Sequence, residues 1–164
     1  MVEALVSGRT ATTLGNKPRV VLDTNVCLDL FVFHDPRWDS LLVALKRGQL
    51  QAVTRGDCRM EWQIVLGYPH LPLDRESKAR SAAEFDALIT CLADANPTRA
   101  LAPLPICSDT DDQKFLELAR DANASVLITK DKALLKLARK TAQAGLFAIV
   151  TPDAWLLETQ KRIE

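Results

Sequence analysis

The stretch DQKFLELARDANASVLITKD, residues 112–131, joins a helix pattern directly to a strand pattern. Phe115 and Leu116 follow Asp112 at three and four residues, which is the spacing of one face of an α-helix. Residues 126–129 (VLIT) then form an apolar run, as expected of a strand that is covered on both faces. A helix followed at once by such a strand indicates an α/β fold with a parallel sheet.

The same alternation extends in both directions along the chain. Strands are predicted at residues 20–24, 51–54, 126–129 and 148–151. Helices are predicted at residues 27–33, 36–48, 57–68, 74–95, 112–124, 132–144 and 152–160. The proline-rich residues 97–106 are expected to form a loop or a segment at the edge of the sheet. This order predicts a parallel sheet between helical layers, with ligands binding beyond the carboxyl ends of the strands.

The composition is that of one globular domain. The 164 residues are 48% apolar and 26% charged. Residues 1–17 lack clear periodicity, so we expect a flexible leader, followed by a single domain over residues 18–164. Lys+Arg and Asp+Glu both number 21. The resulting net charge of zero argues against strong nonspecific binding of nucleic acid, although a local basic patch remains open.

The cysteine and histidine pattern argues against a zinc site. These residues are Cys27, His34, Cys58, His70, Cys91 and Cys107. No two cysteines form a CxxC pair, and the histidines are isolated from them. Scattered cysteines are typical of reduced core residues, and the sequence has no signal-peptide pattern or bilayer-length apolar run. We therefore expect a cytoplasmic protein without membrane contact.

Acidic residues stand at two predicted strand ends and at one helix start. Asp23 ends the first strand and Asp131 follows the third, so both are expected at the same edge of a parallel sheet. Asp112 lies on the apolar face of its helix, whereas Asp111 is turned toward solvent and Asp109 is placed to cap the helix. We therefore expect the carboxylates at residues 23, 112 and 131 to converge.

Glu61 is a fourth candidate acid. Its neighbours one helical turn away, Cys58, Ile64 and Val65, are apolar, so its carboxylate needs a cation, a hydrogen-bond partner or a place at the rim. Carboxylates that share a small volume repel each other unless a cation neutralises them, and Mg²⁺ or Mn²⁺ prefers such oxygen ligands. Phosphoryl transfer and phosphodiester hydrolysis are the reactions that such sites most often perform.

Four segments together resemble a known family. They are VVLDTNV (20–26), RMEWQIVL (59–66), SDTDDQKFLELA (108–119) and VLITKDKALL (126–135). Over about residues 19–157 the chain resembles the PIN domain of metal-dependent ribonucleases, and within that family the VapC-type toxins of bacterial toxin–antitoxin systems. Two features depart from many relatives: Lys130 replaces a glycine, and Glu61 lacks the usual serine five residues before it.

The resemblance implies a three-layer α/β/α sandwich that cleaves single-stranded RNA with Mg²⁺ or Mn²⁺. The family's acidic quartet falls on Asp23, Glu61, Asp112 and Asp131. The three aspartates are expected to bind the metal, and Asn25 and Thr129 are expected to support these ligands. An antitoxin protein and a second copy of the chain, forming a homodimer, are the protein partners that the resemblance implies.

Basic residues near the acids are candidate contacts to the RNA backbone. They are Arg55 and Arg59, just before Glu61, and Lys132 and Lys136, just after Asp131. A solvated helix face explains each of these residues at least as well.

Three other functions are alternatives to a metal-dependent ribonuclease. A receiver-type phosphotransfer module also uses strand-end acids, Mg²⁺ and a strand-end lysine. It needs a phosphoacceptor aspartate at the end of its central strand, however, and the strand at residues 51–54 is followed only by Asp57, well past its end. A haloacid-dehalogenase-type phosphatase needs Asp-x-Asp, where this chain has Asp23-Thr24-Asn25. A PIN fold that only binds RNA or protein is the third alternative.

Overall fold

A five-stranded parallel sheet forms the centre of the computed structural model, which describes residues 17–93 and 102–163. The strands are β1 (Arg19–Leu22), β2 (Gln51–Arg55), β3 (Ile89–Leu92), β4 (Val126–Ile128) and β5 (Ala148–Val150). Their order in the sheet is β3-β2-β1-β4-β5. Residues 1–16 of the predicted leader and 97–101 of the predicted loop lie outside the described residues.

Helices connect successive strands. They are α2 (Thr24–Phe31), α3 (Asp39–Lys46), α4 (Gly56–Leu66), α5 (Arg75–Leu88), α6 (Gln113–Asp121), α7 (Lys132–Leu135), α8 (Ala138–Gln143) and α9 (Pro152–Ile163). Short 3₁₀ helices, η1 (Pro36–Trp38) and η2 (Thr110–Asp112), precede α3 and α6. None of the helices in the described part of the chain is long and apolar enough to cross a membrane.

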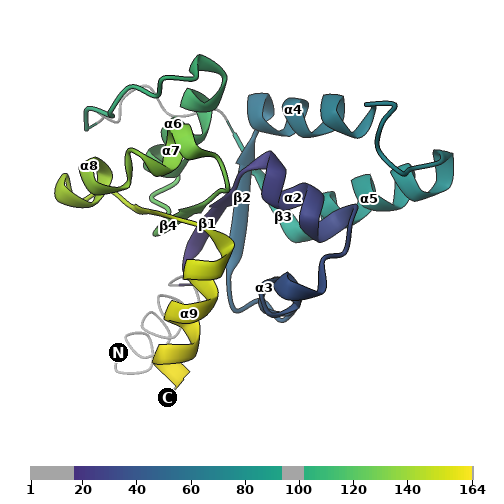
Figure 1. Ribbon diagram of the computed structural model, residues 1–164, viewed down its shortest axis with the longest axis horizontal. Coiled ribbons are helices and arrows are strands. Elements are labelled where there is room, and N and C mark those ends of the chain that lie inside the picture. The colour runs from purple at the N-terminus through teal and green to yellow at the C-terminus, as the bar shows by residue number, and fades with distance from the viewer. Residues whose placement is uncertain (1–16, 94–101, 164) are drawn as a thin grey trace, which may run out of the picture.

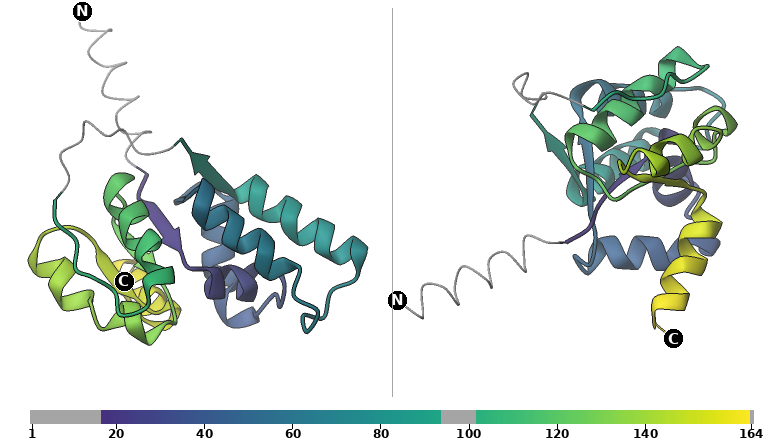
Figure 2. Two further views of the ribbon diagram at one scale, coloured as in Figure 1. Left: turned by 90° about the horizontal axis from the view of Figure 1, so that it is seen from above. Right: turned by 90° about the vertical axis from the view of Figure 1, so that its left-hand side faces the viewer.

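The two faces of the sheet are covered by different helices. Successive residues of a strand point to opposite faces. Accordingly, Val20 and Leu22 of β1 pack in one core with residues of α2, α3, α5 and α9, while Val21 packs in a second core with residues of α6 and α7. Figures 1 and 2 show these two groups of helices on opposite sides of the sheet. The predicted α/β fold, a three-layer α/β/α sandwich with a parallel sheet, is confirmed.

The central position of β1 determines where the acidic side chains emerge. β1 pairs with β2 on one side and with β4 on the other, and Leu22 lies opposite Ile128 in the register. The backbone N–H of Asp23 donates a 3.0 Å hydrogen bond to the carbonyl of Ile128. The chain segments that follow β1 and β4 therefore leave the sheet side by side at its carboxyl edge.

The helix predicted over residues 74–95 is wrong from Ile89 onward. Helix α5 ends at Leu88, and Ile89–Leu92 form β3, which pairs in parallel with β2. The apolar residues of this segment also fit a helical pattern, and only the free edge of β2 makes the strand possible. The β-branched Ile89 and Thr90 favour the extended conformation once that partner is present.

The helix predicted over residues 132–144 is interrupted. It consists of α7 and α8, which are separated by a turn at Lys136 and Leu137. The Leu137 N–H bonds to the carbonyl of Leu134, three residues back, and both leucine side chains are buried in the second core. Burial of these two side chains at a spacing of three residues accompanies the tightened turn.

Candidate metal centre

Three carboxylates from different parts of the chain meet at the carboxyl edge of the sheet. Asp23 directly follows β1, Asp131 follows β4, and Asp112 is the last residue of η2. One carboxylate oxygen from each lies within 4.8 Å of the other two. This is the convergence that the strand ends and the helical spacing predict.

Two of these acids also cap the helices that follow them. Asp23 Oδ1 accepts a 2.6 Å hydrogen bond from the N–H of Thr24, and Asp131 Oδ1 accepts one of 2.8 Å from the N–H of Ala133. Capping explains why aspartate is suited to the starts of α2 and α7. Each cap occupies only one of about four lone-pair sites of a carboxylate, so capping leaves lone pairs for a metal ion.

Thr129 links two of the acids directly. Its hydroxyl donates a 2.6 Å hydrogen bond to Asp23 Oδ2 and accepts one of 2.9 Å from the N–H of Asp131. The Nδ2 of Asn25 lies 3.4 Å from the same Asp23 oxygen, and the Asn25 Oδ1 accepts a 3.3 Å bond from the N–H of Lys130. Thr129 and Asn25 thus lie where support for the acids was predicted.

Burial and mutual repulsion make the centre electrostatically strained. Asp112 is buried, and its Oδ2 has no hydrogen-bond partner among the described residues. Desolvation, and then the neighbouring Asp131 and Asp23 carboxylates, raise the pKa of Asp112 to about 8. Desolvation also raises the pKa of Asp23 to about 6, although its hydrogen bonds with Thr129 and Thr24 act in the opposite direction.

A divalent cation fits this centre. A buried carboxylate oxygen without a donor is costly, and a bound cation would satisfy it and neutralise the shared charge. The donor set consists of carboxylate oxygens, which suit Mg²⁺ or Mn²⁺. Asp23, Asp112 and Asp131 are the residues that would hold the ion.

Glu61 is held apart from the three aspartates. Its Oε1 lies 2.8 Å from Nζ of Lys114, and the hydroxyl of Thr24 donates to its other oxygen, Oε2. Its negative charge raises the pKa of Asp23, so it belongs to the electrostatic surroundings of the centre. The structure therefore brings together three of the four predicted acids and gives Glu61 the cationic partner that its position on α4 requires.

Buried aromatic side chains fix the helix that carries Glu61. Trp62, the next residue, stacks on Phe85 of α5 with ring centroids 4.9 Å apart, and its ring meets Phe31 of α2 edge-on at 6.0 Å. Because aromatic pairs of this kind bury large apolar surfaces, they set the position of α4 against α2 and α5. Glu61 is thereby held beside the start of α2.

The acidic run before α6 divides as the helical spacing predicts. Asp112 is buried, whereas Asp111 is exposed. Asp109 Oδ1 accepts a 3.0 Å hydrogen bond from the N–H of Asp111, which makes Asp109 the cap of η2. Of the three acids in this run, only Asp112 contributes a ligand atom to the group at the sheet edge.

The basic residues predicted to contact RNA have different surroundings. Arg55 lies among three carboxylates, with its guanidinium 2.7 Å from Asp57, 3.0 Å from Glu117 and 3.5 Å from Asp121. Its side chain is only 12% exposed, so it is occupied in an intramolecular network. This arrangement argues against the predicted role of Arg55 as an RNA contact.

The other three predicted contacts are more accessible. Arg59 pairs with Asp86 at 2.9 Å, and its side chain is 34% exposed. Lys132 and Lys136 are exposed, and their backbones are joined by a 3.0 Å hydrogen bond across one helical turn. These two lysines follow Asp131 on α7 and at its end, and they are the best placed of the predicted cations.

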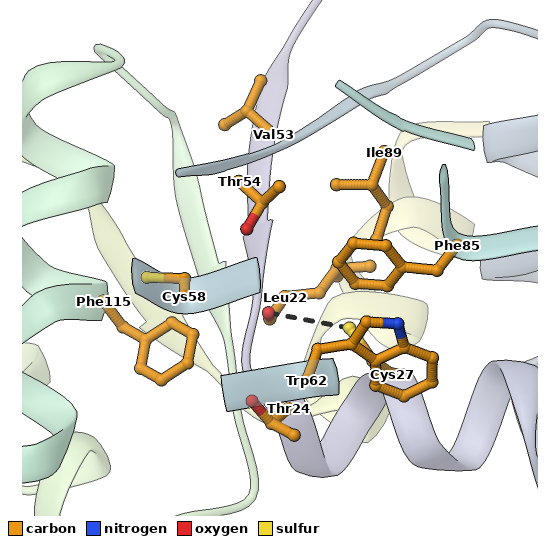
Figure 3. A pocket seen from close by; sticks show the side chains of 10 residues that line it. All are labelled: Leu22, Thr24, Cys27, Val53, Thr54, Cys58, Trp62, Phe85, Ile89 and Phe115. Carbon is orange, nitrogen blue, oxygen red and sulfur yellow. Dashed lines mark hydrogen bonds between the residues drawn. The ribbon is translucent and has the colours of Figure 1, made fainter. Parts of the chain in front are cut away.

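The core behind the start of α2 is closed. A cavity of about 10 Å³, room for roughly one water, lies between Thr24, Cys58, Trp62 and other mostly apolar side chains (Figure 3). Cys27 lines it, with Sγ 3.8 Å from the carbonyl of Leu22, and burial raises the pKa of its thiol well above the ordinary value. Cys27 is therefore a small core residue.

Sequence reasoning missed Lys114 and Asp29. Lys114 bridges α6 and α4 through Glu61, and Asp29 is a buried acid of α2 that pairs with Lys130 at 2.7 Å. The need of Glu61 for a partner was visible in the sequence, but the identity of that partner was not. Asp29 gave no signal because it is a single acid in an otherwise apolar helix.

Comparison with known proteins agrees with the geometry. Residues 19–133 match the family model described as the PIN domain. No curated protein sequence matches significantly. Among solved structures, a chain from the crystal structure of VapBC2 from Rickettsia felis bound to a DNA fragment from their promoter is similar, with a TM-score of 0.54 and 13% identity over 81% of this chain and 98% of that chain. The fold is shared with that chain, and the match to the family model covers all four acids: this protein belongs to the PIN domain family, whose members are nucleases.

Proposed function

We propose that this protein is a Mg²⁺- or Mn²⁺-dependent endoribonuclease that cleaves single-stranded RNA, and that it is the toxin of a toxin–antitoxin pair. The observation that carries the proposal is the group formed by Asp23, Asp112 and Asp131, with oxygens within 4.8 Å of one another and one buried oxygen that finds no partner among residues 17–93 and 102–163. Such a group is costly without a cation, and it lies at the edge of the sheet where α/β proteins bind ligands.

The residues of the centre have separate tasks. A bound divalent ion would activate water for attack and stabilise the charge that develops on the phosphate. Asp23 and Asp131 are held in place by Thr129 and by the caps they form, so their carboxylates are preorganised. Asp112 supplies a buried oxygen that has no hydrogen-bond partner in the part of the chain that the structure describes. The carboxylate of Glu61 binds the ammonium group of Lys114 and holds this positively charged side chain beside the centre.

Recognition of RNA is assigned to exposed cations around the centre. Lys132 and Lys136 are exposed and follow Asp131 directly in the chain. Contacts of this kind bind phosphates and position the strand without reading its sequence. The zero net charge of the chain requires such local contacts, because bulk attraction to RNA is absent.

An antitoxin protein is the proposed regulatory partner, and a homodimer is the proposed assembly. The similar solved chain comes from VapBC2, a complex bound to a promoter DNA fragment. The match to the PIN domain family decides against the receiver-type alternative. A PIN fold that only binds RNA or protein is the alternative that experiment must separate.

The test is cleavage of labelled single-stranded and structured RNAs by the purified protein, in Mg²⁺, in Mn²⁺ or in EDTA. Cleavage is expected only with metal and preferentially on single strands. Asp112→Asn should abolish it, while the matched control Asp111→Asn, which changes a neighbouring exposed acid, should cut nearly as well as the parent. Cleavage that persists in EDTA would disprove the metal mechanism. RNA binding without cleavage under every metal condition would favour the binding-only alternative.

A further inference from the structure

One buried acid takes no part in the proposed metal centre. Asp29 of α2 is 7% exposed, and its Oδ2 accepts a 3.1 Å hydrogen bond from Nε1 of Trp38. The same oxygen lies 2.7 Å from Nζ of Lys130. Buried acids are rare unless they are paired, so Lys130 is the residue that makes this position tolerable.

Both the backbone and the side chain of Lys130 bind residues of α2. Its backbone N–H donates a 3.3 Å hydrogen bond to Asn25 Oδ1, and its ammonium group binds Asp29. Asn25 and Asp29 are four residues apart and therefore lie one above the other on the same face of α2. The loop that contains Thr129, Lys130 and Asp131 is thus held along the helix that begins next to Asp23.

We propose that Lys130 is a positioning residue for the metal centre: by attaching the 129–131 loop to α2, it sets the separation between Asp23 and Asp131 and so the affinity for a divalent cation. The inference rests on the proposed function in that the centre binds such a cation. Partners that orient metal ligands contribute strongly to affinity, and losing one typically weakens binding by about 10- to 100-fold. Lys130 acts through Asp131, and its own ammonium group is paired with Asp29.

A purely structural role for the ion pair must be separated from positioning. Removing Lys130 alone leaves the carboxylate of Asp29 buried without a cation, which destabilises the fold whatever happens at the metal centre. Replacing both residues, as in Lys130→Met with Asp29→Asn, removes the buried charge and keeps an acceptor for Trp38. The double variant should therefore regain most of the lost stability.

Charge and position predict opposite effects on metal affinity. Lys130 carries a positive charge next to Asp131, so its removal should strengthen binding of a cation if only Coulomb repulsion mattered. If Lys130 positions the loop, its removal should weaken binding. Lys132 offers a matched control, because it is an exposed lysine of the same charge on the other side of Asp131.

The experiment is titration of the metal-free protein with Mn²⁺ by calorimetry, together with amide hydrogen exchange of the 129–131 loop. Lys130→Met and the double variant should both bind Mn²⁺ about tenfold more weakly than the parent. Lys132→Met should bind as tightly as the parent or more tightly, and Lys130→Arg should retain most of the affinity. In the metal-free state, the Asp131 amide should exchange faster in Lys130→Met while core amides of the double variant keep their protection.

Distinct results overturn the two proposals. A parent protein that binds no Mn²⁺ would refute the proposed function and, with it, the role of Lys130 in affinity. A parent that binds Mn²⁺, with Lys130→Met binding equally or more tightly, would leave the metal centre standing and refute the positioning role. Recovery of full affinity in the double variant would also refute it, because the ion pair would then matter only for stability.

Discussion

Thr129 donates a 2.6 Å hydrogen bond to Oδ2 of Asp23, a residue 106 positions earlier in the chain. Because the same hydroxyl accepts the N–H of Asp131, it ties together the ends of β1 and β4 at the centre. This hydrogen bond also lowers the pKa of Asp23 against the effect of burial. One buried threonine thus controls both the geometry and the charge of the proposed site.

Thr129→Val should weaken Mn²⁺ binding by about tenfold, because valine has a similar shape and lacks the hydroxyl. The pKa of Asp23 should rise further, so binding should require a higher pH. Calorimetry at several pH values checks both effects. Thr129→Ser, which keeps the hydroxyl, is the control and should bind nearly as tightly as the parent; equal loss in both variants would show that packing alone is responsible.

Stability of the metal-free protein should fall as the pH rises. Folding raises the pKa of Asp112 from 3.8 to about 8, so the folded state favours the protonated acid. The stability linked to that proton is present below about pH 4 and is lost as the pH rises toward 8. Asp23 adds to the loss between about pH 4 and pH 6.

Asp112→Asn should therefore melt at a higher temperature than the parent at pH 8 in EDTA, by roughly 2–4 °C for each kcal/mol of relieved strain. At pH 4 the two proteins should differ much less. Saturating Mn²⁺ should reverse the order at pH 8, because a ligand that binds only the folded state stabilises it. Thermal unfolding followed by circular dichroism gives these values, and a parent that is more stable at pH 8 than at pH 5 without metal would contradict the account.

Substitutions of Glu61 and Lys114 should change the KM for RNA more than they change the affinity for Mn²⁺. Glu61 is bound by Lys114 and Thr24 rather than placed with the three aspartates, so Glu61→Gln should weaken Mn²⁺ binding by less than about fivefold, as a partly exposed charge would. Lys114→Met should leave Mn²⁺ affinity unchanged or improved while raising the KM for RNA. Loss of metal binding in Glu61→Gln as severe as in Asp112→Asn would make Glu61 a ligand after all.

The exposed lysines should contribute to RNA binding, whereas Arg55 should contribute to the stability of the fold. The paired changes Lys132→Ala and Lys136→Ala should weaken RNA binding and flatten its dependence on salt, with the logarithmic slope reduced by about 1.4 for two lost contacts to a single strand. Arg55→Met should instead destabilise the fold by roughly 1–3 kcal/mol, because it leaves three carboxylates without their shared cation. An unchanged salt slope in the lysine variant would leave a solvated helix face as the explanation.

The sequence pattern was sufficient to predict those features of the structure that depend on neighbouring residues. The spacing of Phe115 and Leu116 from Asp112 predicted that this acid lies on the inward face of a helix, and Asp112, the last residue of η2 just before α6, is buried. The positions of Asp23 and Asp131 after two strands were enough to bring them together, because neighbouring parallel strands end at the same edge.

Features that depend on residues far apart in the chain could not be predicted from the sequence. Residues 89–92 fit a helix as well as a strand, and only pairing with β2 decides between them. The interaction of Arg55 with Glu117 and Asp121 joins residues more than sixty positions apart, so its charge looked available for RNA. The lysine at position 130 was visible as a departure from many relatives, yet its partner Asp29 is identified only by the fold.

The central claim is that Asp23, Asp112 and Asp131 together bind one divalent cation. Titration of Mn²⁺ into the protein, followed by the electron paramagnetic resonance signal of free Mn²⁺, measures this without RNA and without catalysis. The account predicts one bound Mn²⁺ per chain in the parent and in Asp111→Asn, release of protons on binding as Asp112 and Asp23 lose theirs, and loss of the site in Asp112→Asn. Full binding by Asp112→Asn, or loss of binding in Asp111→Asn alone, would contradict it.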